Sequence, residues 1–131
     1  MTEEKKSKHW MLVAHNLQHL AKVHEGDRTW WCAPSQCKYG DRAFVYKPQH
    51  GIVLYLQLGT HAPSQEFCEH FRLITTNVQV VEVFDPPIPV KSLRLGTNLK
   101  SETFLRRQFQ GTSFQFISHE SVAEILQIHI I

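Results

Sequence analysis

The chain has 131 residues, of which 42% are hydrophobic and 20% are charged, and its formal net charge is +2. This length and this balance predict one folded domain and exclude both a disordered chain and a pair of full-sized domains. The charge is too small for a protein that binds nucleic acid by electrostatic attraction alone.

The N-terminus, MTEEKKSKHW, lacks the apolar core of a secretory signal. No window approaches the roughly 18 to 20 apolar residues of a membrane span. Three cysteines are an odd number, so a complete disulfide framework is excluded. We therefore expect a cytoplasmic protein without a membrane segment, with residues 1–8 as a flexible tail and residues 9–131 as the domain.

The first half of the chain predicts a strand, a helix, a long loop and a hairpin. HWMLVAH, from residue 9, is an apolar run of strand length, and NLQHLAKVH after it has helical spacing, with Asn16 as its cap. Residues 25–41, EGDRTWWCAPSQCKYGD, have no clear period and contain Gly, Pro and Asp, which predicts a loop. RAFVYK and GIVLYLQL predict two strands, and PQHG between them predicts a hairpin turn.

The second half predicts more strands and a C-terminal helix. Residues 71–84 are rich in Val, Ile and Thr, and their alternation changes parity between Val80 and Val81, which predicts a bulge or a bend. The prolines of DPPIPV cannot donate to a ladder, so we expect the strand to end there, at an edge or outside the sheet. SETFLRRQ predicts a helical turn, SFQFI a strand, and SHESVAEILQIHI a helix capped by Ser118.

Together these elements predict an α+β fold of about five or six short strands with flanking helices, built round a strongly bent sheet or small barrel. The order of the segments resembles the EVE-like branch of the PUA-like superfamily over nearly the whole chain. Its most specific pieces are Gly40 and Asp41 before a strand that carries Phe44 and Tyr46, the proline-rich exit at 86–89, and the FQGTSF turn.

This resemblance implies a PUA-like pseudo-barrel that binds nucleic acid, often by taking one modified base into an aromatic pocket. The superfamily includes YTH readers of N6-methyladenine in RNA, SRA-type readers of 5-methylcytosine in DNA, and EVE domains attached to restriction systems. In the YTH relatives a Trp followed by small polar residues and a Pro supplies one wall of the cage. Trp30, followed by WCAP, occupies a similar place, with Trp31 where those relatives carry a small residue.

The Trp pair also has a meaning apart from the resemblance. Neighbouring residues of an extended segment point to opposite sides, so if one indole is buried the other is turned outward, where a base can stack on it. The alternative is that both indoles pack under the loop. Discrimination between bases also needs hydrogen-bonding groups at the base edge. The candidates are His15, Asn16, Ser35, Gln36, Thr112 and Ser113. For Asn16 and Ser113 a local cap or turn bond is an equal alternative, and for His15 a structural role at a strand edge.

Cations near the second predicted strand and before the QGTS turn are candidates for phosphate contacts. They are Lys38, Arg42, Lys47, Arg106 and Arg107. They form one basic rim if the two segments meet, and are otherwise solvated surface charges.

Two other chemistries have weaker support. Cys32, Cys37, Cys68 and His70 are zinc-ligand types, but their spacing differs from the close cysteine pairs of a structural site, so we expect no metal or other cofactor. ASCH-type relatives include small amidohydrolases that act on modified nucleosides with a Lys, a Thr and a Glu, and no matching motif is found here. Cys32 is a nucleophile only if His15 or His119 approaches it.

The sequence therefore predicts a non-catalytic domain that binds DNA or RNA carrying a modified base, either methylated cytosine or adenine. The alternatives are a small amidohydrolase and a protein-interaction module with an exposed aromatic patch. A separate nuclease or other effector is a further candidate partner. The apolar end ILQIHII suits a dimer seam, and we expect a monomer or a weak dimer.

Overall fold

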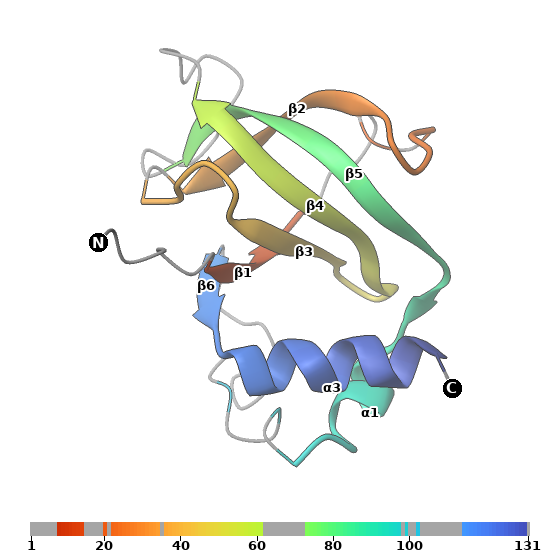
Figure 1. Cartoon of the computed structure of the whole chain (residues 1–131). Helices are drawn as coiled ribbons and strands as arrows, with labels where there is room; N and C mark the ends of the chain where they lie inside the picture. Colours follow the sequence, from red (N-terminus) through yellow and green to blue (C-terminus); the bar gives the residue numbers. More distant parts are fainter. Residues whose placement is uncertain are drawn as a thin grey trace.

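The computed structural model describes residues 8–14, 20, 22–34, 36–61, 73–97, 99, 102 and 114–130. In this part of the chain six strands form one curled sheet (Figure 1). The strands are β1 (His9–Val13), β2 (Arg28–Pro34), β3 (Arg42–Lys47), β4 (Gly51–His61), β5 (Leu73–Ile88) and β6 (Phe114–Ile117). The helices are α1 (Val90–Leu93) and α3 (His119–Ile130). Neither is long and apolar enough to cross a membrane.

The strand order is β2-β5-β4-β3-β1-β6. β1 and β3 pair in parallel, and the other neighbours pair antiparallel. Helix α3 follows β6 directly and lies beside α1 along one side of the sheet, while β2 lies at the opposite end (Figure 1). The fold is the α+β arrangement of a bent sheet with flanking helices that the sequence predicts.

Each face of the sheet carries its own apolar cluster, because side chains alternate along every strand. In β3, Phe44 and Tyr46 belong to the cluster that includes Ile125 of α3. Ala43 and Val45 belong to the second cluster, with the alternate residues of β4 and β5. We call the first side of the sheet the α3 face and the second the opposite face. Near β2 the α3 face is polar, with Arg28, Asn77 and Gln79 among its residues.

Several elements agree with the sequence predictions. Residues 42–47, 51–58 and 114–117 are strands, and the turn after β3 places Gln49 at a φ of 71°. Tyr55 pairs with Glu82 and the next residue of β4 pairs with Val80, so Val81 is the extra residue of a bulge. The Ser118 hydroxyl accepts a hydrogen bond from the Ser121 amide at 3.1 Å and so caps α3.

Other predictions need correction. The expected loop at 25–41 is wrong, because residues 28–34 form β2. This strand depends on pairing with residues 73–79 of β5, far along the chain, so its local sequence gives little sign of it. Strand β5 also continues past Asp85 to Ile88, although its ladder with β4 is irregular across the prolines. Of the predicted helix at 16–24 the structure describes only residues 20 and 22–24, and the predicted turn at 101–108 lies almost wholly outside the described residues.

Asp41 holds the start of the sheet together. Its buried carboxylate accepts hydrogen bonds from the Lys8 amide at 3.0 Å, the Lys38 amide at 2.9 Å and the Trp10 indole at 3.2 Å. These donors come from the beginning of β1 and from the turn before β3. Gly40 precedes Asp41 at a φ of 91°, a conformation that glycine adopts without strain. The Gly-Asp pair is therefore a structural joint.

Candidate nucleic-acid interface

Strand β2 places the two adjacent tryptophans on opposite faces of the sheet. Trp31 pairs with Thr76 and packs against the apolar cluster of the opposite face. Trp30 pairs with Asn77, and it shares the α3 face with that residue. Both indoles are partly buried. The opposite orientation expected of an extended segment is therefore observed, and Trp31 is the one directed into a core cluster.

His61 fixes the surroundings of Trp31. Its Nε2 lies 2.7 Å from the Cys37 carbonyl oxygen, and its Nδ1 lies 2.8 Å from the Thr76 hydroxyl. Because a carbonyl only accepts, Nε2 donates to Cys37, and Nδ1 shares a hydrogen bond with the Thr76 hydroxyl. The imidazole thus ties the segment after β2 to β4 and β5. This clamp holds the end of the strand on which both tryptophans lie.

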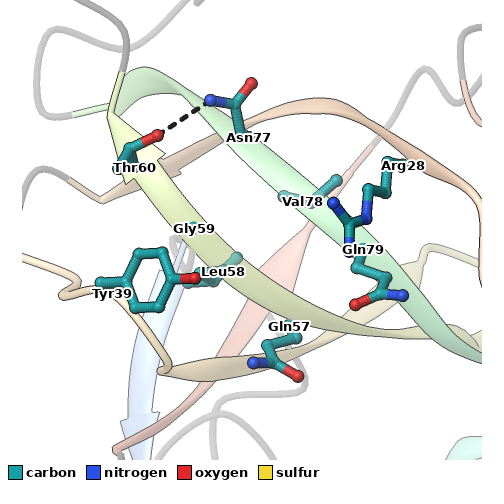
Figure 2. A pocket seen from close by; sticks show the side chains of 9 residues that line it. All are labelled: Arg28, Tyr39, Gln57, Leu58, Gly59, Thr60, Asn77, Val78 and Gln79. Carbon is teal, nitrogen blue, oxygen red and sulfur yellow. Dashed lines mark hydrogen bonds between the residues drawn. The ribbon is translucent and has the colours of Figure 1, made fainter.

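A pocket of about 180 Å³ opens on the α3 face (Figure 2). Trp30 does not line it, but Asn77, which is paired with Trp30, does. It is lined by Arg28, Tyr39, Gln57, Leu58, Gly59, Thr60, Asn77, Val78 and Gln79. Three of these residues have amide side chains, and none is acidic. The Asn77 amide donates to the Thr60 hydroxyl at 2.9 Å, which orients it at the rim. Gly59 has no side chain to fill the floor, where a Cβ would lie 3.1 Å from the Asn77 carbonyl.

The strand register creates a line of polar residues through this pocket. Arg42 of β3 pairs with Gln57 of β4, Gln57 pairs with Gln79 of β5, and Gln79 pairs with Arg28 of β2. Directly paired residues share a face, so all four side chains start from the α3 face. Neighbouring strands lie about 4.8 Å apart, so the line measures about 14 Å from end to end. We call these four residues the polar row.

His9 of β1 continues this line and joins a basic cluster at the start of α3. It pairs with Arg42, its Nε2 lies 3.0 Å from the Tyr55 hydroxyl, and its ring centroid lies 5.4 Å from that of His119. The Arg42 guanidinium lies 5.5 Å from the centroid of the Tyr55 ring. Burial lowers the pKa of His9, and the nearby His119 and Arg42 lower it further, while Asp41 raises it. The His9 ring is therefore neutral near pH 7.

The structure locates six of the predicted site residues. Trp30 is on the α3 face, paired with Asn77 of the pocket, Trp31 is on the opposite face, and Gln36 is exposed in the segment after β2. Lys38 and Arg42 lie at the pocket end of β3, whereas Lys47 lies at its other end, about 17 Å from Arg42 at 3.3 Å per residue. The described cations of β3 thus form no single rim. The other predicted residues lie outside the described part of the chain: His15, Asn16, Ser35, Arg106, Arg107, Thr112 and Ser113.

None of the nine residues that line the pocket was among the predicted site residues, and five of the nine carry an amide, guanidinium or phenol group. These are Arg28, Tyr39, Gln57, Asn77 and Gln79. The sequence pattern does contain a sign of the last three. Gln57, Asn77 and Gln79 are the polar members of an alternating pattern in which most of the residues next to them are Leu or Val. Arg28 and Tyr39 fall within the segment that was expected to be a loop.

The two described cysteines have no thiolate. Cys32 is disulfide-bonded, and burial raises the pKa of the Cys37 thiol far above its usual range. Neither can therefore act as a thiolate nucleophile or zinc ligand in this state. Within the described residues, no group of three or more His, Cys, Asp or Glu side chains is placed to hold a metal ion. Cys68 and His70 lie outside those residues.

No protein-family model and no curated protein matches the chain. Several solved structures resemble it over nearly their whole length. A hypothetical protein from Leishmania major is 16% identical with a TM-score of 0.70, and the alignment covers 95% of this chain and 96% of that one. Human THYN1, solved with DNA containing 5-methylcytosine, is 18% identical with a TM-score of 0.65 and coverages of 94% and 98%. An ASCH protein from Zymomonas mobilis is 11% identical with a TM-score of 0.53 and coverages of 92% and 94%. The chain therefore adopts the PUA-like fold that EVE and ASCH domains share.

Proposed function

We propose that this chain binds nucleic acid and recognises a modified base, without catalysing a reaction on it. The observation that carries the proposal is the pocket lined by Tyr39, three amide side chains and Arg28, on the face of the sheet that also carries Trp30. The likeness to human THYN1, which was solved with DNA containing 5-methylcytosine, supports it.

The pocket residues have the chemistry that base recognition needs. The amides of Gln57, Asn77 and Gln79 each offer both a donor and an acceptor, which is what the edge of a base presents. An indole face such as that of Trp30 stacks on any base, and in other systems such stacking contributes about 1–3 kcal/mol. Arg28 supplies a cation for a phosphate at the rim. The aromatic ring gives affinity, and the amides give selectivity.

The base must leave its stack to reach this pocket. Unstacking and unpairing cost a few kcal/mol, and stacking with edge hydrogen bonds must recover that amount. One added methyl group changes the binding free energy by about 1–3 kcal/mol when it meets apolar surface. We therefore expect a preference of roughly tenfold or more for the preferred modified base over its unmodified form.

The likeness to ASCH proteins keeps a small amidohydrolase as the second candidate. Hydrolysis of an amide requires a group that activates water, most often a histidine, an acidic side chain, a lysine, a tyrosine or a metal. Of these residue types the pocket lining contains a single tyrosine, Tyr39, and no acidic residue, lysine or histidine. The pocket chemistry therefore favours binding over hydrolysis.

The test is fluorescence anisotropy with short DNA and RNA oligomers. They carry cytosine, 5-methylcytosine, 5-hydroxymethylcytosine, adenine or N6-methyladenine, and the proteins are wild type, Trp30→Ala, Trp30→Phe and Trp31→Ala. We expect one modified oligomer to bind at least tenfold better, Trp30→Ala to abolish that preference and Trp30→Phe to retain part of it. Trp31→Ala should instead lower the melting temperature, because Trp31 packs against a core cluster.

Two results would contradict the proposal. If no oligomer binds at low salt, the chain does not bind nucleic acid through this face. If modified nucleosides incubated with the protein lose a substituent by hydrolysis, followed by liquid chromatography, the chain is an amidohydrolase and the second candidate holds.

A further inference from the structure

We propose that the polar row and Tyr39 together bind a single strand of nucleic acid that crosses β3, β4, β5 and β2. This inference rests on the proposed function and narrows its substrate to a strand whose bases are unpaired on both sides of the recognised base. Its basis is the register of four strands, the position of one exposed tyrosine and the charge of the surface.

The polar row is a continuous surface, because it is built from directly paired residues of adjacent strands. Its two ends are cationic, with Arg42 on β3 and Arg28 on β2, and its middle consists of the two glutamines. Arginine at the ends suits phosphate oxygens, whereas the amides between them suit base edges. A strand that crosses the sheet would meet phosphate contacts at the ends and base contacts in between.

Tyr39 offers a stacking surface next to the row. Its side chain is 78% exposed, which is unusual for a large aromatic residue, and it lines the pocket near Gly59 (Figure 2). The turn that carries it is tightly bonded: the Gly40 amide donates to the Leu58 carbonyl at 2.9 Å, and the Asp41 amide to the Lys38 carbonyl at 3.0 Å. A ring on a fixed turn loses little freedom when a base stacks on it.

The charge of this face favours a single strand over a duplex. Proteins that grip duplex backbone neutralise many phosphates, often 6–10, whereas the row supplies two arginines. None of the residues lining the pocket is acidic and one, Arg28, is cationic, so the pocket itself is weakly positive. Since paired bases are hidden inside a duplex, Tyr39 can stack only on an unpaired base. Stacking therefore replaces the electrostatic affinity that this surface lacks.

Anisotropy with single-stranded and duplex forms of the same unmodified oligomer tests the inference. We expect the single strand to bind at least tenfold better. Tyr39→Ala should weaken it about 5- to 150-fold, the equivalent of about 1–3 kcal/mol, while Tyr39→Phe retains most of the affinity. Leu95→Ala is the matched control, because Leu95 is 79% exposed in the turn after α1, away from the pocket.

Salt dependence gives a second readout. Two arginine contacts predict that log K falls with log salt at a slope of about −1.4 for a single strand, and Arg28→Ala should reduce this slope by about 0.7. Arg94→Ala, which removes an exposed charge at the end of α1, should leave the slope unchanged.

The outcomes separate this inference from the proposed function. If the duplex binds as tightly as the single strand, or if Tyr39→Ala behaves like Leu95→Ala, the single-strand inference is wrong. In that case a preference for a modified base that Trp30→Ala removes still supports the proposed function. If neither form of any oligomer binds, the inference and the function fail together.

Discussion

Asp41→Asn should be among the most destabilising isosteric changes in this chain. The carboxylate accepts from three donors, two of them at Oδ2 and one at Oδ1. An asparagine that keeps its oxygen toward Trp10 and Lys38 turns its NH₂ group against the Lys8 amide, so one bond to an ionised acceptor is lost. That loss costs about 1.5–3 kcal/mol, and each remaining bond weakens as it becomes neutral. Water can reach the exposed residues Lys8 and Lys38, so we take the lower end of this range, about 1.5 kcal/mol, for the lost bond. Weakening of the two remaining bonds brings the total to about 3 kcal/mol.

Urea unfolding measures this loss. A shift in the midpoint at constant slope reports a change in stability, and for 131 residues about 3 kcal/mol lowers the melting temperature by about 12 °C. Asp27→Asn is the matched control, since the exposed Asp27 carboxylate accepts one bond, from the His24 amide at 2.8 Å, and should cost less than about 1 kcal/mol. Trp10→Phe combined with Asp41→Asn should show a coupling energy above about 0.5 kcal/mol. A loss for Asp41→Asn no larger than that of Asp27→Asn would refute the role of the Gly-Asp pair as a structural joint.

Three further results are expected. Gly51→Ala should lower the free energy of unfolding in urea by more than about 2 kcal/mol, since Gly51 has a φ of 118° and a Cβ there meets the backbone of β5. The control Gly26→Ala should lower it by about 1 kcal/mol, because Gly26 has a φ of 89° but open space around an added Cβ. Equal losses would contradict this expectation. Because the pKa of His9 is lowered in the folded protein, the contribution of its neutral ring to stability should be fully present above pH 6.5 and should be lost as the pH falls below that value. NMR titration of His119→Ala should show a higher pKa for His9, because His119 lowers it; an unchanged pKa would exclude the coupling. Because the pKa of Cys37 is raised, stability should fall as pH rises above about 9, and Cys37→Ala should flatten that fall; an identical pH profile would rule it out.

Local sequence determined much of the sheet. The alternation in RAFVYK and GIVLYLQL marks β3 and β4, because a strand with one apolar phase on each face has a period of two. The parity change at Val81 marks the bulge, since one extra residue reverses the side on which the following residues lie. Ser118 marks the start of α3, because a hydroxyl there satisfies a free amide of the first turn. In each case the physical cause lies within a few residues.

Strand β2 was hidden from the sequence. Its Gly, Pro and Cys neighbours suggest a loop, and it becomes a strand because β5 supplies partners for its backbone amides and carbonyls. The tryptophan pair therefore looked like a loop feature, although the expected divergence of the two indoles was correct. The tertiary pairing decided that Trp31 faces a core cluster and that Trp30 lies on the α3 face.

The pocket and the polar row belong to the tertiary structure alone. Arg28, Gln57 and Gln79 lie far apart in the sequence, and each looks like an ordinary solvent-facing residue of a strand. The registers of β2 with β5 and of β5 with β4 align them, and a shift of one residue in either would send a side chain to the other face. The sequence by itself determined the alternation that builds the sheet and the PUA-like resemblance. Register, which is fixed by many distant contacts at once, decided which polar residues meet on one surface.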